Sequence, residues 1–195
     1  LYLNETDWET FAGETGADKE MLKTWEGLAQ AAGMYYEWSG GSPFLGMNAF
    51  NDFAALSAAQ LGEGIRWTQD GPEFNYSRDT ARRVWDAYYV PHIKGWYESR
   101  TYNQDGIKSG RLMAYIGSSA GAGFFPQLVI EDEKQSHPIS CQSYAYPVFQ
   151  DGTPYMGQRG ANMAVFASDE SHQQAAVRFL KWFTQPEQNI RLSLI

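Results

Sequence analysis

Amphipathic helical segments alternate along this chain with short apolar runs, and this alternation limits its fold more strongly than any other feature. Apolar residues recur at helical spacing over 5–12, after Thr24, over 49–61, after Ser77 and over 168–183. Apolar runs at 111–116, 144–149 and 161–166 are typical of buried strands. Helices and strands that alternate in this way indicate an α/β architecture.

The clearest amphipathic segment follows Ser77, which we expect to cap a helix. Trp85 lies on its apolar face, and Pro91 is expected to end or kink it. Trp25 and Trp182 lie on similar helical stripes, so we expect these three tryptophans to be in the core.

A loop of small residues at 117–123 follows the strand expected at 111–116, and we expect a helix over 124–130 after it. Small residues let a backbone approach a ligand closely. Ser118 and Ser119 offer hydroxyls, and the amides of a following helix N-terminus can hold hydroxyls or an anion. The alternative is a tight strand-to-helix turn with no ligand.

A second loop, bounded by glycines, contains Gly157, Gln158 and Arg159 and precedes an apolar run. An arginine in such a loop can clamp a carboxylate, a phosphate or vicinal hydroxyls. The alternative is an ordinary surface arginine.

Three aromatic residues lie beside loop signals, namely Tyr36, Trp38 and Trp96, and helical periodicity breaks at the two tryptophans. Flat aromatic faces suit the apolar C–H face of a sugar ring, while polar neighbours hold its hydroxyls. The alternative is that these rings belong to the core.

Charge and composition exclude some classes of partner. Lys plus Arg is 15 and Asp plus Glu is 23 in 195 residues, which gives a formal net charge of −8. An acidic surface disfavours binding to nucleic acid and to anionic lipid, so we expect neither. A hydrophobic fraction of 43% is enough for a packed core.

Motifs of several enzyme classes are missing from the sequence. His92, His137 and His172 lack metal-ligand spacing, and no Gly-x-Ser-x-Gly or Gly-Lys-Ser/Thr motif occurs. The single cysteine, Cys141, has no obvious base partner. We therefore expect no catalytic residue, no metal and no cofactor.

The first residue is Leu1 rather than Met, and the last residue, Ile195, falls inside an expected helix. From these two features we expect the sequence to be a fragment of a longer protein.

Four motifs occur in a characteristic order. They are Leu1-Tyr2-Leu3-Asn4 before a helix, Thr24-Trp25-Glu26-Gly27-Leu28, the element from Ile107 to Ala114, and a glycine-led run from Gly160 to Phe166 with a helix from Ala175 to Glu187. Together they resemble the extracellular solute-binding proteins of bacterial ABC importers, in the carbohydrate-type group called family 1. In the third motif Ile107 replaces the usual Phe, and Met113-Ala114 reverse the usual pair.

The resemblance implies an α/β, periplasmic-binding-protein-like (type II) fold, in which two lobes close on a ligand. It implies that 1–117 belong to the second lobe, that 118–183 cross back to the first lobe, and that 184–195 start the return. About half of the first lobe is then missing. By position, Ser118, Ser119 and the loop from Gly157 to Gly160 would touch the ligand, with Trp38 and Trp96 facing the cleft.

The function implied by the resemblance is that of a non-enzymatic, extracellular sugar receptor. It would be a monomeric lipoprotein or periplasmic protein that delivers its ligand to an ABC transporter permease. Two alternatives stay open. The same fold can bind a phosphorylated polyol such as glycerol phosphate, through Ser118, Ser119 and Arg159. A carbohydrate-active hydrolase would need two carboxylates that face one pocket at roughly 5–10 Å.

Overall fold

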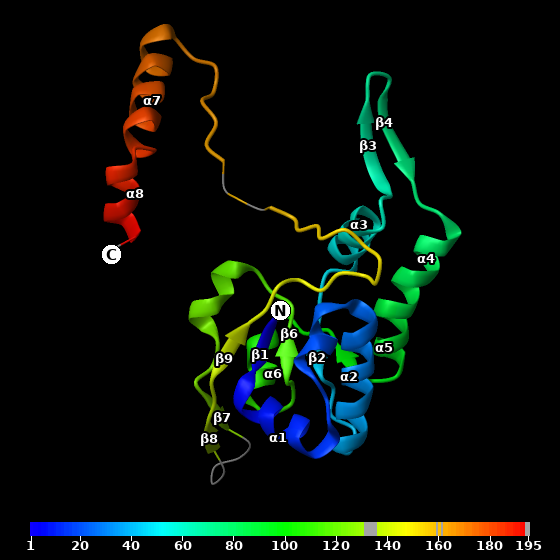
Figure 1. Cartoon of the computed structure of the whole chain (residues 1–195). Helices are drawn as coiled ribbons and strands as arrows, with labels where there is room; N and C mark the ends of the chain where they lie inside the picture. Colours follow the sequence, from blue (N-terminus) through cyan, green and yellow to red (C-terminus); the bar gives the residue numbers. More distant parts are fainter. Residues whose placement is uncertain (131–135, 159, 161, 194–195) are drawn as a thin grey trace. The chain divides into compact units, whose positions relative to one another are not determined.

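The computed structural model describes residues 1–130, 136–158, 160 and 162–193. The chain divides into two compact units, Leu1–Gly157 and Gln158–Ile195. Figure 1 traces both along the chain.

A five-stranded sheet forms the centre of the first unit, with strand order β5-β2-β6-β1-β9. Its strands are β1 (Tyr2–Asn4), β2 (Leu45–Gly46), β5 (Tyr97–Glu98), β6 (Ala114–Tyr115) and β9 (Cys141–Ser143). Strand β2 is parallel to both β5 and β6, whereas β1 is antiparallel to β6 and β9. The carboxyl ends of β2, β5 and β6 therefore lie at the same end of the sheet, which we call the carboxyl edge.

Residues on the two faces of the sheet belong to two separate hydrophobic clusters. Leu3, Leu45 and Ala114 share the larger cluster with buried residues of α1 (Glu5–Thr15), α2 (Trp25–Trp38) and α3 (Phe50–Gln60). Tyr2 and Tyr115 share the smaller one with residues of α6 (Asn103–Lys108) and β7 (Leu128–Ile130). This division follows from the alternation of side chains along each strand.

The remaining elements of the first unit are short. They are the 3-10 helices Lys19–Lys23 and Ser119–Phe124, α4 (Arg78–Val84), the π-helical turn Trp85–Tyr89, α5 (Val90–Ile93), the hairpin of β3 (Gly64–Thr68) and β4 (Gly71–Asn75), and β8 (Ser136–Pro138), which pairs with β7. The β3–β4 hairpin projects from the unit beyond the end of α3 (Figure 1).

Side-chain caps explain where the helices start. Thr24 Oγ1 accepts a hydrogen bond from the N–H of Gly27 at 3.0 Å, and Ser77 Oγ accepts from Thr80 at 3.1 Å. Both predicted caps are therefore confirmed, and α3 agrees with the helix expected over 49–61. Helix α1 continues past residue 12 and ends at Thr15, before Gly16, whose φ of 74° is the left-handed conformation that glycine adopts readily.

The prediction of a helix over 124–130 is wrong. The structure has a 3-10 turn up to Phe124 and then strand β7, in which Leu128 and Ile130 are exposed and Val129 is fully buried. Pro126 has no N–H to donate within a helix, and pairing with β8 together with burial of Val129 favours the strand.

The strand expected at 111–116 is confirmed as β6, although it is shorter. The prediction of a strand over 144–149 is wrong: Tyr144 exchanges backbone hydrogen bonds with Leu1, but beyond it the stretch makes only the isolated pair of Val148 with Thr24. Its backbone groups bond instead to Lys23 and to the side chain of Gln60, and Pro147 has no N–H for a strand ladder.

The helix after Ser77 does not end at Pro91, because a π-helical turn precedes the proline and α5 continues through it. Val84 and Ala87 are buried and continue the helical spacing of buried Thr80, whereas Trp85 lies beside this stripe and is 50% exposed. The expected core position of Trp85 is therefore wrong, while that of Trp25 is confirmed.

The second unit contains α7 (Glu170–Phe183) and α8 (Pro186–Ser193), as the sequence predicts. Residues 162–166 form no strand, and residue 161 lies outside the described part of the chain. No other strand is described in this unit, so this run has no pairing partner within it. Trp182, expected in the core, is 49% exposed.

Candidate ligand-binding site

The carboxyl edge of the sheet gathers the loops that follow β2, β5 and β6. In open α/β sheets, ligands bind outside the carboxyl ends of the strands. Three short loops occupy this position here, at 47–49, 99–102 and 116–119. They form the candidate site of the first unit.

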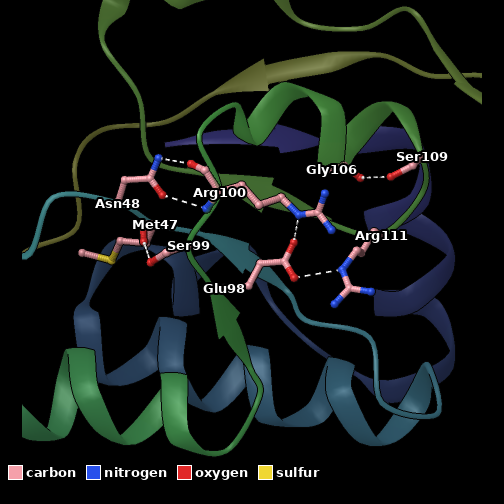
Figure 2. A network of polar contacts seen from close by, with 8 residues as sticks. All are labelled: Met47, Asn48, Glu98, Ser99, Arg100, Gly106, Ser109 and Arg111. Carbon is pink, nitrogen blue, oxygen red and sulfur yellow. Dashed lines mark hydrogen bonds and ion pairs between the residues drawn. The ribbon is translucent and has the colours of Figure 1, made fainter.

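Side-chain hydrogen bonds join the loops after β2 and β5 (Figure 2). Asn48 Oδ1 accepts from the N–H of Arg100 at 3.0 Å, and Asn48 Nδ2 donates to the Arg100 carbonyl. Ser99 Oγ donates to the carbonyl of Met47 at 2.8 Å. These bonds hold the backbone of both loops in one arrangement before any ligand arrives.

Two arginines surround the carboxylate of Glu98, the last residue of β5 (Figure 2). Arg100 Nε donates to Glu98 Oε1, and Arg111 Nε donates to Glu98 Oε2 at 2.8 Å. The Glu98 side chain is 17% exposed. The single carboxylate of Glu98 is therefore shared by two guanidinium groups, that of Arg100 after β5 and that of Arg111 before β6.

The loop after β6 rests on tyrosine rings. The hydroxyl of Tyr2 lies 2.9 Å from the Ser118 carbonyl and 3.2 Å from the Ser119 carbonyl. The Tyr2 ring stacks on Tyr115 with 5.0 Å between ring centroids. Burial raises the pKa of Tyr115 to about 12. Ser118 and Ser119 themselves are exposed at the carboxyl edge.

Exposed aromatic rings flank these loops in the sequence. Phe50, at the start of α3, is 52% exposed, and Tyr102, after β5, is 67% exposed. The residue before α3, Ala49, has a φ of 57°, a conformation uncommon outside glycine. The loops thus combine amide, hydroxyl and aromatic groups, which is the composition that suits a neutral polyhydroxylated ligand.

The structure places Tyr36, Trp38 and Trp96 away from these loops. They precede β2 and β5, and so lie towards the opposite, amino edge of the sheet. Trp38 Nε1 donates to Glu14 at 2.8 Å, and its ring packs against Phe11. The sheet therefore separates these three aromatic residues from the two serines of the β6 loop.

Close packing accounts for the positions of Tyr36 and Trp96. The Trp96 ring lies against Gly33, where an added methyl group would be 3.0 Å from the ring, and Lys94 Nζ is 4.3 Å from the ring centre. Tyr36 lies similarly close to Gly95. Both rings fill the contact between the end of α2 and the turn before β5.

The second predicted loop is divided between the two units. Gly157 ends the first unit and lies beside Leu56 of α3, whereas Gln158 starts the second unit and is exposed. Arg159 lies outside the described residues. A role of these three residues in ligand binding stays a prediction.

The titratable groups that metal or nucleophile chemistry needs are dispersed. In the described ranges, no group of three His, Cys, Asp or Glu side chains could hold a metal ion. His137 bonds Asp7, which is distant in the sequence, and His172 bonds Asp169 three residues before it. Partial burial raises the pKa of the Cys141 thiol, which disfavours the reactive thiolate.

Sequence reasoning missed Asn48 and Arg100. Strands β2 and β5 have two residues each, too few to show the alternation that marks a strand. A usable signal was the apolar run Phe44-Leu45-Gly46-Met47 directly before the helix expected over 49–61. Such a run resembles a short buried strand with Asn48 at its carboxyl end.

The described fold and the loops at its carboxyl edge define a protein of the periplasmic-binding class. Residues 1–194 match the family of bacterial extracellular solute-binding proteins, and the chain belongs to this family. No curated protein matches the sequence with statistical significance. Among the described residues, no helix is both long enough and apolar enough to cross a membrane.

A solved structure shares this fold, namely the cyclic α-maltosyl-1,6-maltose binding protein from Arthrobacter globiformis. The match has a TM-score of 0.62 and 17% sequence identity. It covers 96% of this chain but 46% of the other, so this chain spans less than half the length of that protein. The predicted family resemblance and the α/β, periplasmic-binding-protein-like fold are both confirmed.

Proposed function

We propose that the protein is a receptor that captures a sugar or oligosaccharide between two lobes and delivers it to an ABC transporter permease. This proposal is based on the groups that the carboxyl edge of the first unit presents. The edge presents the hydroxyls of Ser118 and Ser119 together with loops that Asn48 fixes, and exposed Phe50 and Tyr102 flank them in the sequence. The neighbour of the same fold is named for binding a maltose-based sugar, which supports this ligand class.

The second candidate ligand of the same fold is a phosphorylated polyol. The anion argument needed an α-helix after Ser119, and the structure has a six-residue 3-10 turn there instead. Arg100 and Arg111 share the single carboxylate of Glu98. The 3-10 turn favours a neutral sugar, and Arg159 is the residue on which the phosphate alternative continues to depend.

The lobe arrangement is part of the proposal. Residues 1–117 would belong to the second lobe, 118–183 would cross to the first lobe, and 184–195 would start the return. Helix α7 supports this, because it carries an apolar stripe and yet none of its residues is buried. A remaining part of the first lobe would cover that stripe. Ligand would then favour the closed state by contacting both lobes.

The proposal includes the partner of the receptor and its location. The receptor would act outside the cell as a monomer, either as a lipid-anchored protein or in the periplasm, and would dock on the membrane permease after closure. The family to which the chain belongs is extracellular.

Calorimetric titration of the full-length protein tests the proposal. One ligand set contains glucose, maltose, maltotetraose and cyclic α-maltosyl-1,6-maltose, and the other contains glycerol phosphate and glycerophosphodiesters. Saturable binding in the first set without product release is the expected result. Binding only in the second set would replace the sugar with a phosphorylated ligand. If a cleaved sugar accumulated in the calorimeter cell, the protein would be a hydrolase.

A further inference from the structure

Tyr2 lies in the middle of the sheet, directly opposite Tyr115 of β6. Because β1 runs antiparallel to β6, its first residues lie at the carboxyl edge, beside the point where β6 ends. Tyr2 is 4% exposed, and its ring packs on Tyr115 and on Phe125, with 5.0 Å and 6.4 Å between the respective ring centroids. Packing on these two rings restricts the position of its hydroxyl group.

The hydroxyl proton of Tyr2 is shared between two successive carbonyls, those of Ser118 and Ser119. A donor that two successive carbonyl groups share restricts the orientation of the two peptide planes that contain them. The loop also lies close to the rings below it. A methyl group added at Gly117 would be 2.8 Å from Tyr115, and one added at Gly121 would be 3.7 Å from Tyr2.

We propose that Tyr2 is a positioning residue for the β6 loop, which acts on ligand affinity by fixing the backbone of Ser118 and Ser119. This inference rests on the proposed function for its effect on affinity, but its effect on the loop is independent of any ligand. Tyr2 itself is buried and need not touch the ligand. Its contribution is to hold the two exposed serines in one conformation, which lowers the entropy lost on binding.

The structure offers a matched control in the same aromatic stack. The hydroxyl of Tyr115 is buried and has no hydrogen-bond partner among the described residues. Tyr115→Phe therefore removes an equivalent oxygen without breaking a bond, whereas Tyr2→Phe removes the bond to the loop and leaves the ring stack.

The first measurement is amide hydrogen exchange of the peptide covering 117–124 in the unliganded full-length protein. Tyr2→Phe should increase its exchange rate about fivefold, as expected from the loss of one hydrogen bond, and Tyr115→Phe should leave it unchanged. Equal exchange in the wild type and in Tyr2→Phe would overturn the inference, whether or not a sugar binds.

The second measurement is the affinity for maltotetraose by calorimetry. Tyr2→Phe should weaken binding about fivefold relative to Tyr115→Phe, with both variants retaining the wild-type far-ultraviolet circular dichroism. Faster loop exchange with unchanged maltotetraose affinity would overturn the link between the loop and the ligand. If the wild type binds no member of either ligand set, the proposed function fails, and the exchange result still decides whether Tyr2 orders the loop.

Discussion

The carboxamide of Asn48 pairs with both backbone groups of Arg100. Its Oδ1 accepts from the Arg100 N–H at 3.0 Å, and its Nδ2 donates to the Arg100 carbonyl. The last backbone bond between the two strands runs from the N–H of Met47 to the carbonyl of Glu98. Asn48 thus continues the parallel pairing of β2 and β5 into the loops of the candidate site.

Substitution Asn48→Asp should weaken sugar binding and lower stability. It keeps the size and the acceptor but places a carboxylate oxygen against the Arg100 carbonyl. We expect a loss of about 1 kcal/mol in the free energy of unfolding and an approximately fivefold weaker affinity, measured by urea denaturation and calorimetry. Ser109→Ala, which removes a bond to the Gly106 carbonyl at the far end of α6, serves as the control. An affinity equal to that of the control would contradict the role of Asn48.

Substitution Glu98→Gln should change both stability and ligand preference. It removes the one negative charge that Arg100 and Arg111 share; their side chains are 36% and 54% exposed. Solvent screens such partly exposed pairs, so we expect a loss of about 1 kcal/mol by urea denaturation. Two arginines without their carboxylate should also bind glycerol phosphate more tightly than in the wild type.

The control for Glu98 is the ion pair between Arg82 and Asp86, whose side chains are 75% and 51% exposed. Asp86→Asn should lower the free energy of unfolding by less than about 0.5 kcal/mol. If Glu98→Gln behaves like this control in stability and leaves phosphate affinity unchanged, the carboxylate does not organise the two arginines.

Substitution Gln60→Ala should be strongly destabilising. The side chain is 1% exposed, and it donates to the Pro147 carbonyl at 2.9 Å and accepts from the Phe149 N–H at 3.3 Å. Its loss leaves a cavity and two buried backbone groups without partners. We therefore expect the free energy of unfolding, measured by urea denaturation, to fall by about 2–4 kcal/mol. Gln142→Ala, at an exposed position, should be nearly neutral. Similar midpoints for both variants would show that the 144–153 segment is not held by α3.

Alkaline pH should destabilise the first unit. Burial raises the pKa of Tyr35 and of Tyr115 from 10.0 to about 12. At a pH between these two pKa values, the phenol of the unfolded chain has lost its proton, whereas the phenol of the folded chain keeps it. Stability is therefore fully present below pH 10 and falls as pH rises towards 12. Thermal melts of the wild type and of Tyr115→Phe across this range should show a shallower fall for the variant; identical slopes would exclude Tyr115 as a source.

Local signals in the sequence were sufficient for much of the fold. Thr24 and Ser77 mark helix starts because a cap and the N–H groups it binds lie within one helical turn. The helix over 170–183 is evident from its periodicity alone. The position of Ser118 and Ser119 after a buried strand was also predictable, since small residues follow an apolar run there.

The predictions failed where partners distant in the sequence decide the structure. Val129 lies in a strand because β8 and the smaller core are available to it, not because of its neighbours in the sequence. Trp85 is exposed because the unit packs against the face of the helix that carries Thr80, Val84 and Ala87. In both cases a local pattern was present, and packing in the assembled unit overruled it.

Helix caps, apolar stripes and family motifs were thus determined by the sequence itself, because each depends on residues close together along the chain. Which loops meet at the carboxyl edge was decided by the assembled sheet. Asn48 and Arg100 are 52 residues apart and Tyr2 and Ser118 are 116 apart, and no local pattern pairs them. Strand order and direction bring them together, because hydrogen bonding between β2, β5, β6 and β1 sets which strand ends share one edge.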